Sequence, residues 1–90
     1  MVTTILSHAV ENFEKWLGVF NEHESVRTAA GIRVKGVYRG ADNPNQVTVI
    51  TEADNHEAFD RFMADPTLAE AMKNGGVTGP PQATRMTEVK

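Results

Sequence analysis

The sequence predicts one α+β domain with the element order β-α-β-β-α-β. Two stretches place apolar residues at helical spacing, and four shorter stretches are β-branched or alternate between apolar and polar residues. No repeat, low-complexity tract or change of composition divides the 90 residues, a length typical of one small domain. The range 1–90 is therefore expected to be a single domain.

The first strand is expected over Val2–Ser7, which is β-branched and apolar, and it ends at His8. Asn12 or Glu11 is suited to cap the helix that follows. This helix carries the largest apolar stripe of the chain, at the i, i+3, i+4 and i+7 spacing of one helical face: Phe13, Trp16, Leu17 and Phe20.

The end of this helix has two interpretations. It continues to 29–30, where Gly31 supplies a left-handed stop, or it breaks near Glu22–Ser25, where helix formers are weak. In both cases His23 and Arg27, three and seven positions after Phe20, are polar residues on the same helical face as the apolar stripe.

The segment Ile32–Arg39 alternates with period two, which predicts a second strand whose inward row contains Ile32, Val34 and Tyr38. Gly36 falls in the same row, where a missing side chain lets a neighbour or ligand approach closely. The turn residues of 40–45 then join this strand, as a hairpin, to a third strand over Gln46–Glu52.

The remaining segments predict a second helical layer and a last strand. Asp54 and Glu57 resemble a capping box. The stripe of the helix that they open consists of Phe59, Phe62 and Met63. Asp65-Pro66 ends this helix and begins a short one. We expect the glycine-rich segment 75–81 to be the loosest part of the chain, either a plain loop or a flexible flap beside a pocket. The last strand is expected to cover Ala83–Val89.

This element order is the split βαβ, or ferredoxin-like, arrangement, in which an antiparallel four-stranded sheet carries the helices on one face. The strands retain apolar or β-branched residues at positions that include several on the uncovered face: Thr3, Ile5, Val37, Thr48, Ile50, Thr84 and Met86. A second copy of the chain would cover that face by two-fold symmetry, so we expect a homodimer.

Charge and composition argue against several classes of function. The net charge is −3, and the Lys and Arg residues are scattered, which disfavours nucleic-acid binding. The chain has no cysteine, and its three histidines lack metal-ligand spacing. No run approaches the roughly 20 apolar residues of a membrane span, and the start lacks a signal-peptide pattern. We therefore expect no membrane partner and a cytoplasmic protein.

Five segments carry a family likeness: Ser7–Val10 leading into Asn12–Trp16, Phe20–Glu24, Ala29–Gly31, Arg39–Asn45 and Asp65–Met72. In these segments the chain resembles the dimeric α/β-barrel superfamily. Within it, the chain is most similar to the small stand-alone proteins labelled antibiotic-biosynthesis-monooxygenase-like or cyclase-like. The resemblance implies a homodimer whose two sheets close into a barrel, with a small-molecule cavity between each sheet and its own helices.

Two residues are candidates for proton transfer in such a cavity. His8, between the first strand and the main helix, is expected at its mouth, and an imidazole titrates near neutral pH. A structural histidine bonded to a loop carbonyl is the alternative. Tyr38 is expected to point toward the helices, where its hydroxyl would bind His8 or a ligand oxygen, or would only reach the rim of the core.

Aromatic side chains of the two helical layers are expected to form the apolar walls of the cavity: Trp16, Phe20, Phe59 and Phe62. The same spacing also suits an ordinary core. His23 and Arg27 either bind an acidic or phenolic ligand at the rim or mark the point where the helix leaves the core.

The leading hypothesis is a cofactor-independent enzyme, monooxygenase-like or cyclase-like, that acts on an aromatic or polyketide-like metabolite. In it His8 is the acid–base group, Tyr38 donates a hydrogen bond, and neither a cofactor nor a metal takes part. One alternative is a non-catalytic small-molecule-binding or stress-responsive protein of the same fold. The other is a haem-binding or haem-degrading protein that uses one histidine.

Overall fold

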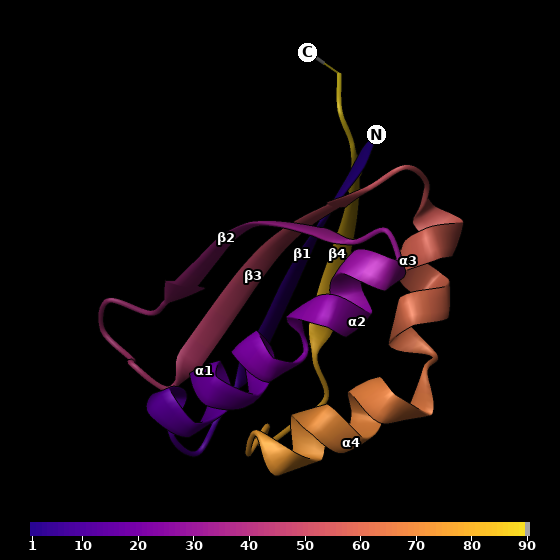
Figure 1. Cartoon of the computed structure of the whole chain (residues 1–90). Coiled ribbons are helices and arrows are strands. Elements are labelled where there is room, and N and C mark those ends of the chain that lie inside the picture. Colours follow the sequence, from indigo (N-terminus) through magenta and orange to yellow (C-terminus); the bar gives the residue numbers. More distant parts are fainter. Residues whose placement is uncertain (90) are drawn as a thin grey trace.

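A computed structural model describes residues 1–89 and confirms the ferredoxin-like α+β fold. Its elements are β1 (Val2–Ala9), α1 (Phe13–Glu22), α2 (Glu24–Ala29), β2 (Arg33–Arg39), β3 (Gln46–Ala53), α3 (His56–Met63), α4 (Pro66–Asn74) and β4 (Gln82–Thr87). The strands form one antiparallel sheet in the order β2-β3-β1-β4. All helices lie on one face of this sheet (Figure 1). We call this the helix face and the opposite one the open face.

The first strand is longer than expected. β1 runs to Ala9 and pairs with β3 along its whole length, so His8 lies inside the strand, opposite Val47, and not at or beyond its end. Thr4, Leu6 and His8 are the buried residues of β1, which places the imidazole on the helix face. The end-of-strand prediction for His8 is therefore wrong, because the ladder to β3 carries the strand two residues further.

The main helix breaks at His23, as one of the two interpretations predicted. Asn12 caps α1, its Oδ1 accepting a hydrogen bond from the Lys15 amide at 3.1 Å. A second hydrogen bond joins the two helices across the break, because Arg27 Nη1 donates to the Phe20 carbonyl at 2.8 Å. Gly31 follows α2 with a φ of +80°, the left-handed conformation expected of it.

A bulge in β2 overturns the part of the predicted inward row that follows Val34, whereas Ile32 is buried as predicted. Its pairing with β3 shifts between Val34 and Gly36, so Lys35 is an extra residue in the ladder. Such an insertion moves every later side chain to the other face. Val37 consequently packs against the buried cluster around Trp16, whereas Tyr38, expected inside, is 57% exposed on the open face.

The close approach predicted at Gly36 exists, but on the open face. A Cβ placed on Gly36 would lie 2.6 Å from Cε2 of the Tyr38 ring. The absence of a side chain at position 36 therefore lets the phenol lie flat over the strand rather than admitting a ligand to the core.

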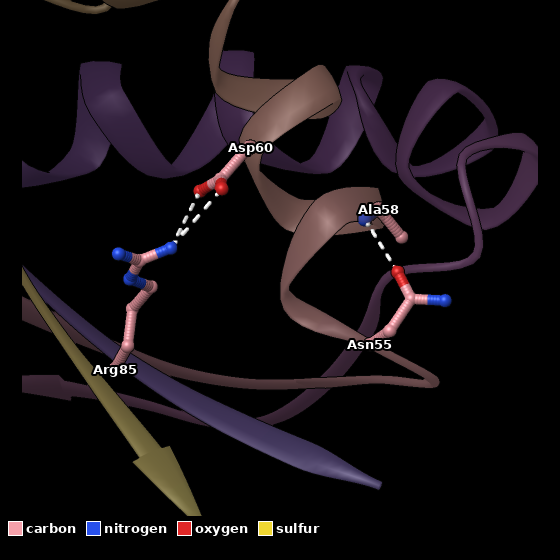
Figure 2. A network of polar contacts seen from close by, with 4 residues as sticks. All are labelled: Asn55, Ala58, Asp60 and Arg85. Atoms are coloured by element: carbon pink, nitrogen blue, oxygen red, sulfur yellow. Dashed lines mark hydrogen bonds and ion pairs between the residues drawn. The ribbon is translucent and has the colours of Figure 1, made fainter.

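The start of α3 differs from the predicted capping box. Asn55, and not Asp54, is the N-cap, and its Oδ1 accepts a hydrogen bond from the Ala58 amide at 2.8 Å (Figure 2). On the same helix Asp60 Oδ2 pairs with Arg85 Nη1 at 3.1 Å, which ties α3 to β4. The predicted start of α4 is confirmed, with Pro66 in its first turn.

The glycine-rich segment after α4 is not loose over its first half. Gly75 and Gly76 are buried, and the Gly76 carbonyl accepts a hydrogen bond from the Glu11 amide at 2.9 Å. The Thr78 amide donates to the Ala9 carbonyl at 3.0 Å. The flap prediction is therefore wrong for 75–78, which is bonded to the end of β1. β4 then ends at Thr87, two residues before the predicted limit.

Candidate functional site

A pocket of about 60 Å³ lies between the sheet and the helices. Every predicted site residue except Tyr38 lines it: His8, Trp16, Phe20, His23, Arg27, Phe59 and Phe62. They come from β1, α1, α2, α3 and the break between the first two helices. The helical stripes and the strand alternation thus converge on one place, although the residues span more than half of the chain.

His8 is the polar group on the sheet side of the pocket. Its side chain is 5% exposed, and its ring meets Trp16 edge-on, with 5.6 Å between the ring centroids. Nδ1 is buried without a hydrogen-bond partner. Burial lowers the pKa of His8 from its usual 6.5, and the nearby backbone of Ala9 opposes this only in part. At neutral pH the imidazole is therefore uncharged, the form that accepts a proton.

Trp16 forms the main aromatic wall. It stacks on Phe20 with 4.8 Å between the ring centroids and lies 5.9 Å from Phe13. These rings follow from the spacing of the α1 stripe, because residues three and four positions apart lie one above the other on a helix. The single tryptophan of the chain is thus in direct contact with the pocket.

Arg27 and His23 supply further nitrogen atoms to the pocket. Arg27 is 7% exposed, and its guanidinium carbon lies 3.7 Å from the centroid of the Phe20 ring. Burial lowers the pKa of this guanidinium, and the charge of Glu24 acts in the opposite direction. Arg27 Nε and His23 Nε2 are both buried without a hydrogen-bond partner.

Thr51 and the α4 residues were not identified from the sequence as part of the pocket wall. Thr51 is a buried pocket residue of β3, and its Oγ1 donates to the Thr4 carbonyl at 3.5 Å. A threonine in the inward row of an otherwise valine-rich strand was the signal that could have indicated it. The α4 residues Leu68, Ala71 and Met72 complete the wall, and their helical spacing indicated only a buried face.

Tyr38 and His8 do not share a cavity. The register places Tyr38 opposite Thr48, whose hydroxyl bonds to Ser7 on the open face, at 2.9 Å between the two oxygens. The hydrogen bond between Tyr38 and His8, one of the alternatives that the sequence offered, therefore does not form within one chain. The bulge at Lys35 is the reason.

Within residues 1–89, no group of three or more His, Cys, Asp or Glu side chains is placed to hold a metal ion. The helices of the same range are all too short or too polar to span a membrane.

Comparisons with known proteins identify a family and a fold. A family model described as "Domain of unknown function (DUF3764)" matches residues 1–84. No curated protein matches the chain. The solved structures similar to it over nearly their whole length include the following three.

SnoaB, a cofactor-independent oxygenase from Streptomyces nogalater, has a TM-score of 0.78 at 20% identity, over 99% of this chain and 93% of its own. The Nitrosomonas europaea protein named "Putative antibiotic biosynthesis monooxygenase" has a TM-score of 0.74 at 12% identity, over 100% of both chains. Protein Atu4242 from Agrobacterium tumefaciens has a TM-score of 0.73 at 16% identity, over 100% of this chain and 95% of its own. These similarities confirm the antibiotic-biosynthesis-monooxygenase-like fold.

Proposed function

We propose that this chain, which belongs to the DUF3764 family of domains of unknown function, is a cofactor-independent enzyme acting on a small aromatic or polyketide-like molecule. Its chemistry would be monooxygenase-like or cyclase-like and would take place in the pocket between sheet and helices. One observation carries the proposal: His8 holds an unpaired, buried nitrogen in an aromatic-walled pocket. Buried polar atoms are rarely left unpaired, and a catalytic role is one of the recognised reasons for an exception.

In the proposed reaction His8 is the general base. Its neutral imidazole takes a proton from an acidic C–H or O–H group of the ligand, which leaves an imidazolium and a ligand anion. The anion then attacks a carbonyl group of the same ligand, as in a cyclase, or reacts with O₂. The lowered pKa of His8 keeps the base free of a proton at neutral pH.

The size of the pocket sets a condition on this proposal. A volume of about 60 Å³ is smaller than the roughly 150 Å³ of an engineered cavity that binds benzene. Ligand pockets commonly enclose about 300–1,000 Å³. A ligand must therefore displace wall side chains, and Met72 is the best suited to move, because methionine is unbranched and has three rotatable bonds. A haem group is far larger still, so we do not extend the proposal to haem.

The experiment is oxygen consumption with a hydroxyanthrone, whose CH₂ group between two aromatic rings is acidic. Oxidation of that carbon to a carbonyl group consumes one O₂, with one oxygen atom entering the product and the other leaving as water. We expect turnover by the wild-type protein and a loss of roughly 100-fold or more in His8→Gln. Ser7→Ala, one residue away on the open face, is the matched control and should keep the wild-type rate. Equal rates in His8→Gln and wild type would refute the role of His8.

Non-catalytic binding of the same kind of ligand is the second candidate. It is favoured by the position of Tyr38, because His8 lacks the phenol partner that proton transfer was expected to use. Saturable binding of the hydroxyanthrone without oxygen consumption would support this candidate.

We also propose that the open face pairs with a second copy of the chain. Apolar side chains on that face remain partly or largely exposed: Ile5, Ile50, Tyr38 and Met86. Ile5 and Ile50 lie side by side in the centre of the sheet, and Tyr38 lies on a neighbouring strand. An isologous contact between two such faces would remove all of them from water.

A further inference from the structure

Arg27 is a buried cation that makes no ion pair, although the charge of Glu24 on the same helix acts on it from a longer distance. It is 7% exposed, and within residues 1–89 no carboxylate lies within 4.0 Å of its guanidinium. Its one hydrogen bond in that range runs from Nη1 to the Phe20 carbonyl. Burying a charge without a counter-charge is costly, so the arrangement suits a protein that acquires the counter-charge from a ligand.

The free side of the guanidinium has the geometry of a carboxylate site. One N–H of Nη1 is bonded to Phe20, and the edge of the guanidinium away from Nη1 carries Nε, which is buried without a partner, and Nη2 beside it. Two neighbouring N–H groups of this kind match the two oxygens of a carboxylate and bind it with parallel hydrogen bonds. A single-oxygen acceptor would leave one of the two donors unpaired.

The position of Arg27 divides an apolar space from a polar one. It lines the aromatic pocket, whose lining contains no carboxylate side chain. It also lines a surface groove of about 600 Å³ between α1, α2 and β2. Phe20 borders both spaces as well. The charged groups of the groove are Glu24, Arg27 and Arg33, two cations against one carboxylate. The apolar part of an amphipathic acid would fit in the pocket, and its carboxylate would lie at the boundary beside Arg27.

We propose that Arg27 binds the carboxylate of the ligand, so that the site selects aromatic or other apolar carboxylic acids over their neutral counterparts. This rests on the pocket of the proposed function but not on its proton transfer. The two histidines of the pocket, His8 and His23, fit the same ligand, since each has a buried nitrogen available to a polar substituent. Arg27 is thus a specificity-determining residue as well as a link between α1 and α2.

The test compares benzoate with benzamide, which has nearly the same shape and no charge. Binding is followed by the fluorescence of Trp16, the only tryptophan and a wall of the pocket. We expect wild type to bind benzoate about tenfold or more tightly than benzamide, as a charge-assisted hydrogen-bonded pair provides. In Arg27→Met, which keeps much of the side-chain volume, this preference should vanish through weaker benzoate binding. Arg27→Lys should keep the sign of the preference.

If Arg27 had only a structural role, Arg27→Met would not abolish the preference for benzoate, because loss of the bond to Phe20 would weaken the binding of benzoate and benzamide alike. The proposal is overturned if wild type binds the two ligands equally, if benzoate does not bind, or if Arg27→Met keeps the preference. The wild-type comparison decides the matter even if Arg27→Met fails to fold. His8→Gln separates the two proposals, since it should lose turnover and keep the benzoate preference. A preference without turnover refutes the enzyme alone, and turnover without a preference refutes the carboxylate site alone.

Discussion

The two faces of the sheet are built from the same strands but differ in burial, because the helices cover only one of them. On the helix face, Val47, Val49 and Thr51 of β3 are buried, and they contact the helices or line the pocket. On the open face, Thr48 and Ile50 of the same strand stay partly exposed. Alternation along a strand therefore marks two faces without indicating which of them the helices cover.

This difference separates the face that holds the folded chain together from the face on which we propose that a second copy binds. The helix face contains both buried clusters and all of the polar nitrogen atoms of the pocket. The open face has apolar side chains but, within residues 1–89, nothing that covers them. We expect substitutions on the first face to change folding and ligand binding, and those on the second to change assembly.

The largest effect is expected from a matched pair of isoleucines. Ile32 is 3% exposed and packs against the α3 residues Phe59 and Phe62, so Ile32→Ala should lower the free energy of unfolding by about 2–5 kcal/mol. That is a large share of the 5–15 kcal/mol typical of a domain. Ile50→Ala on the open face should cost less in the isolated protomer. Urea unfolding of both variants at low protein concentration measures the difference, and equal losses would contradict the contrast between the faces.

Assembly should respond to charge on the open face. Ile50→Lys places an ammonium group beside Ile5 at the centre of the proposed contact, and desolvating it there should raise the dimer dissociation constant by roughly 100-fold or more. Sedimentation equilibrium over a range of concentrations provides the measurement. Thr78→Lys, on an exposed loop position, is the control and should remain dimeric. A wild-type protein that stays monomeric at every concentration would rule out the second copy.

A smaller effect is expected in the pH dependence of stability. The pKa of His8 is lower in the folded chain than its usual 6.5, so the unfolded chain binds the proton first as the pH falls. Stability from this source is present above about pH 6.5 and is lost as the pH falls from there through the folded pKa. The profile is measured by thermal unfolding at each pH, and subtracting that of His8→Gln from that of wild type isolates the contribution of His8. A difference profile that is flat or rises toward acid would contradict the burial of a neutral imidazole.

The smallest effect should come from the ion pair that ties α3 to β4. Arg85 and Asp60 are both about half exposed, so Arg85→Met should change the free energy of unfolding by less than about 1 kcal/mol. Salt provides the control, because screening should remove the difference between the variants. A loss comparable to that of Ile32→Ala would show that the contact of α3 with β4 matters far more than its exposure indicates.

Local patterns predicted the helices and most of the pocket. The i, i+3, i+4 and i+7 spacing located α1, and Asn12 and Pro66 marked helix starts correctly, because caps and stripes depend on residues within one or two turns. The cap at Asn55 was missed by one residue, since Asp54 beside it has an equally suitable side chain. The polar continuation of the α1 stripe likewise indicated Arg27 and His23 as pocket residues.

The sequence by itself determined the order of the elements, the stripes of the helices and the identity of the aromatic walls, since each depends on contacts between residues close along the chain. Only the tertiary structure decided where β1 ends, that Lys35 forms a bulge and that Tyr38 faces away from His8. A bulge exists only relative to the partner strand, and no period within β2 reveals it. The unpaired charge of Arg27 belongs to the same class of facts, because it depends on which carboxylates the fold brings near.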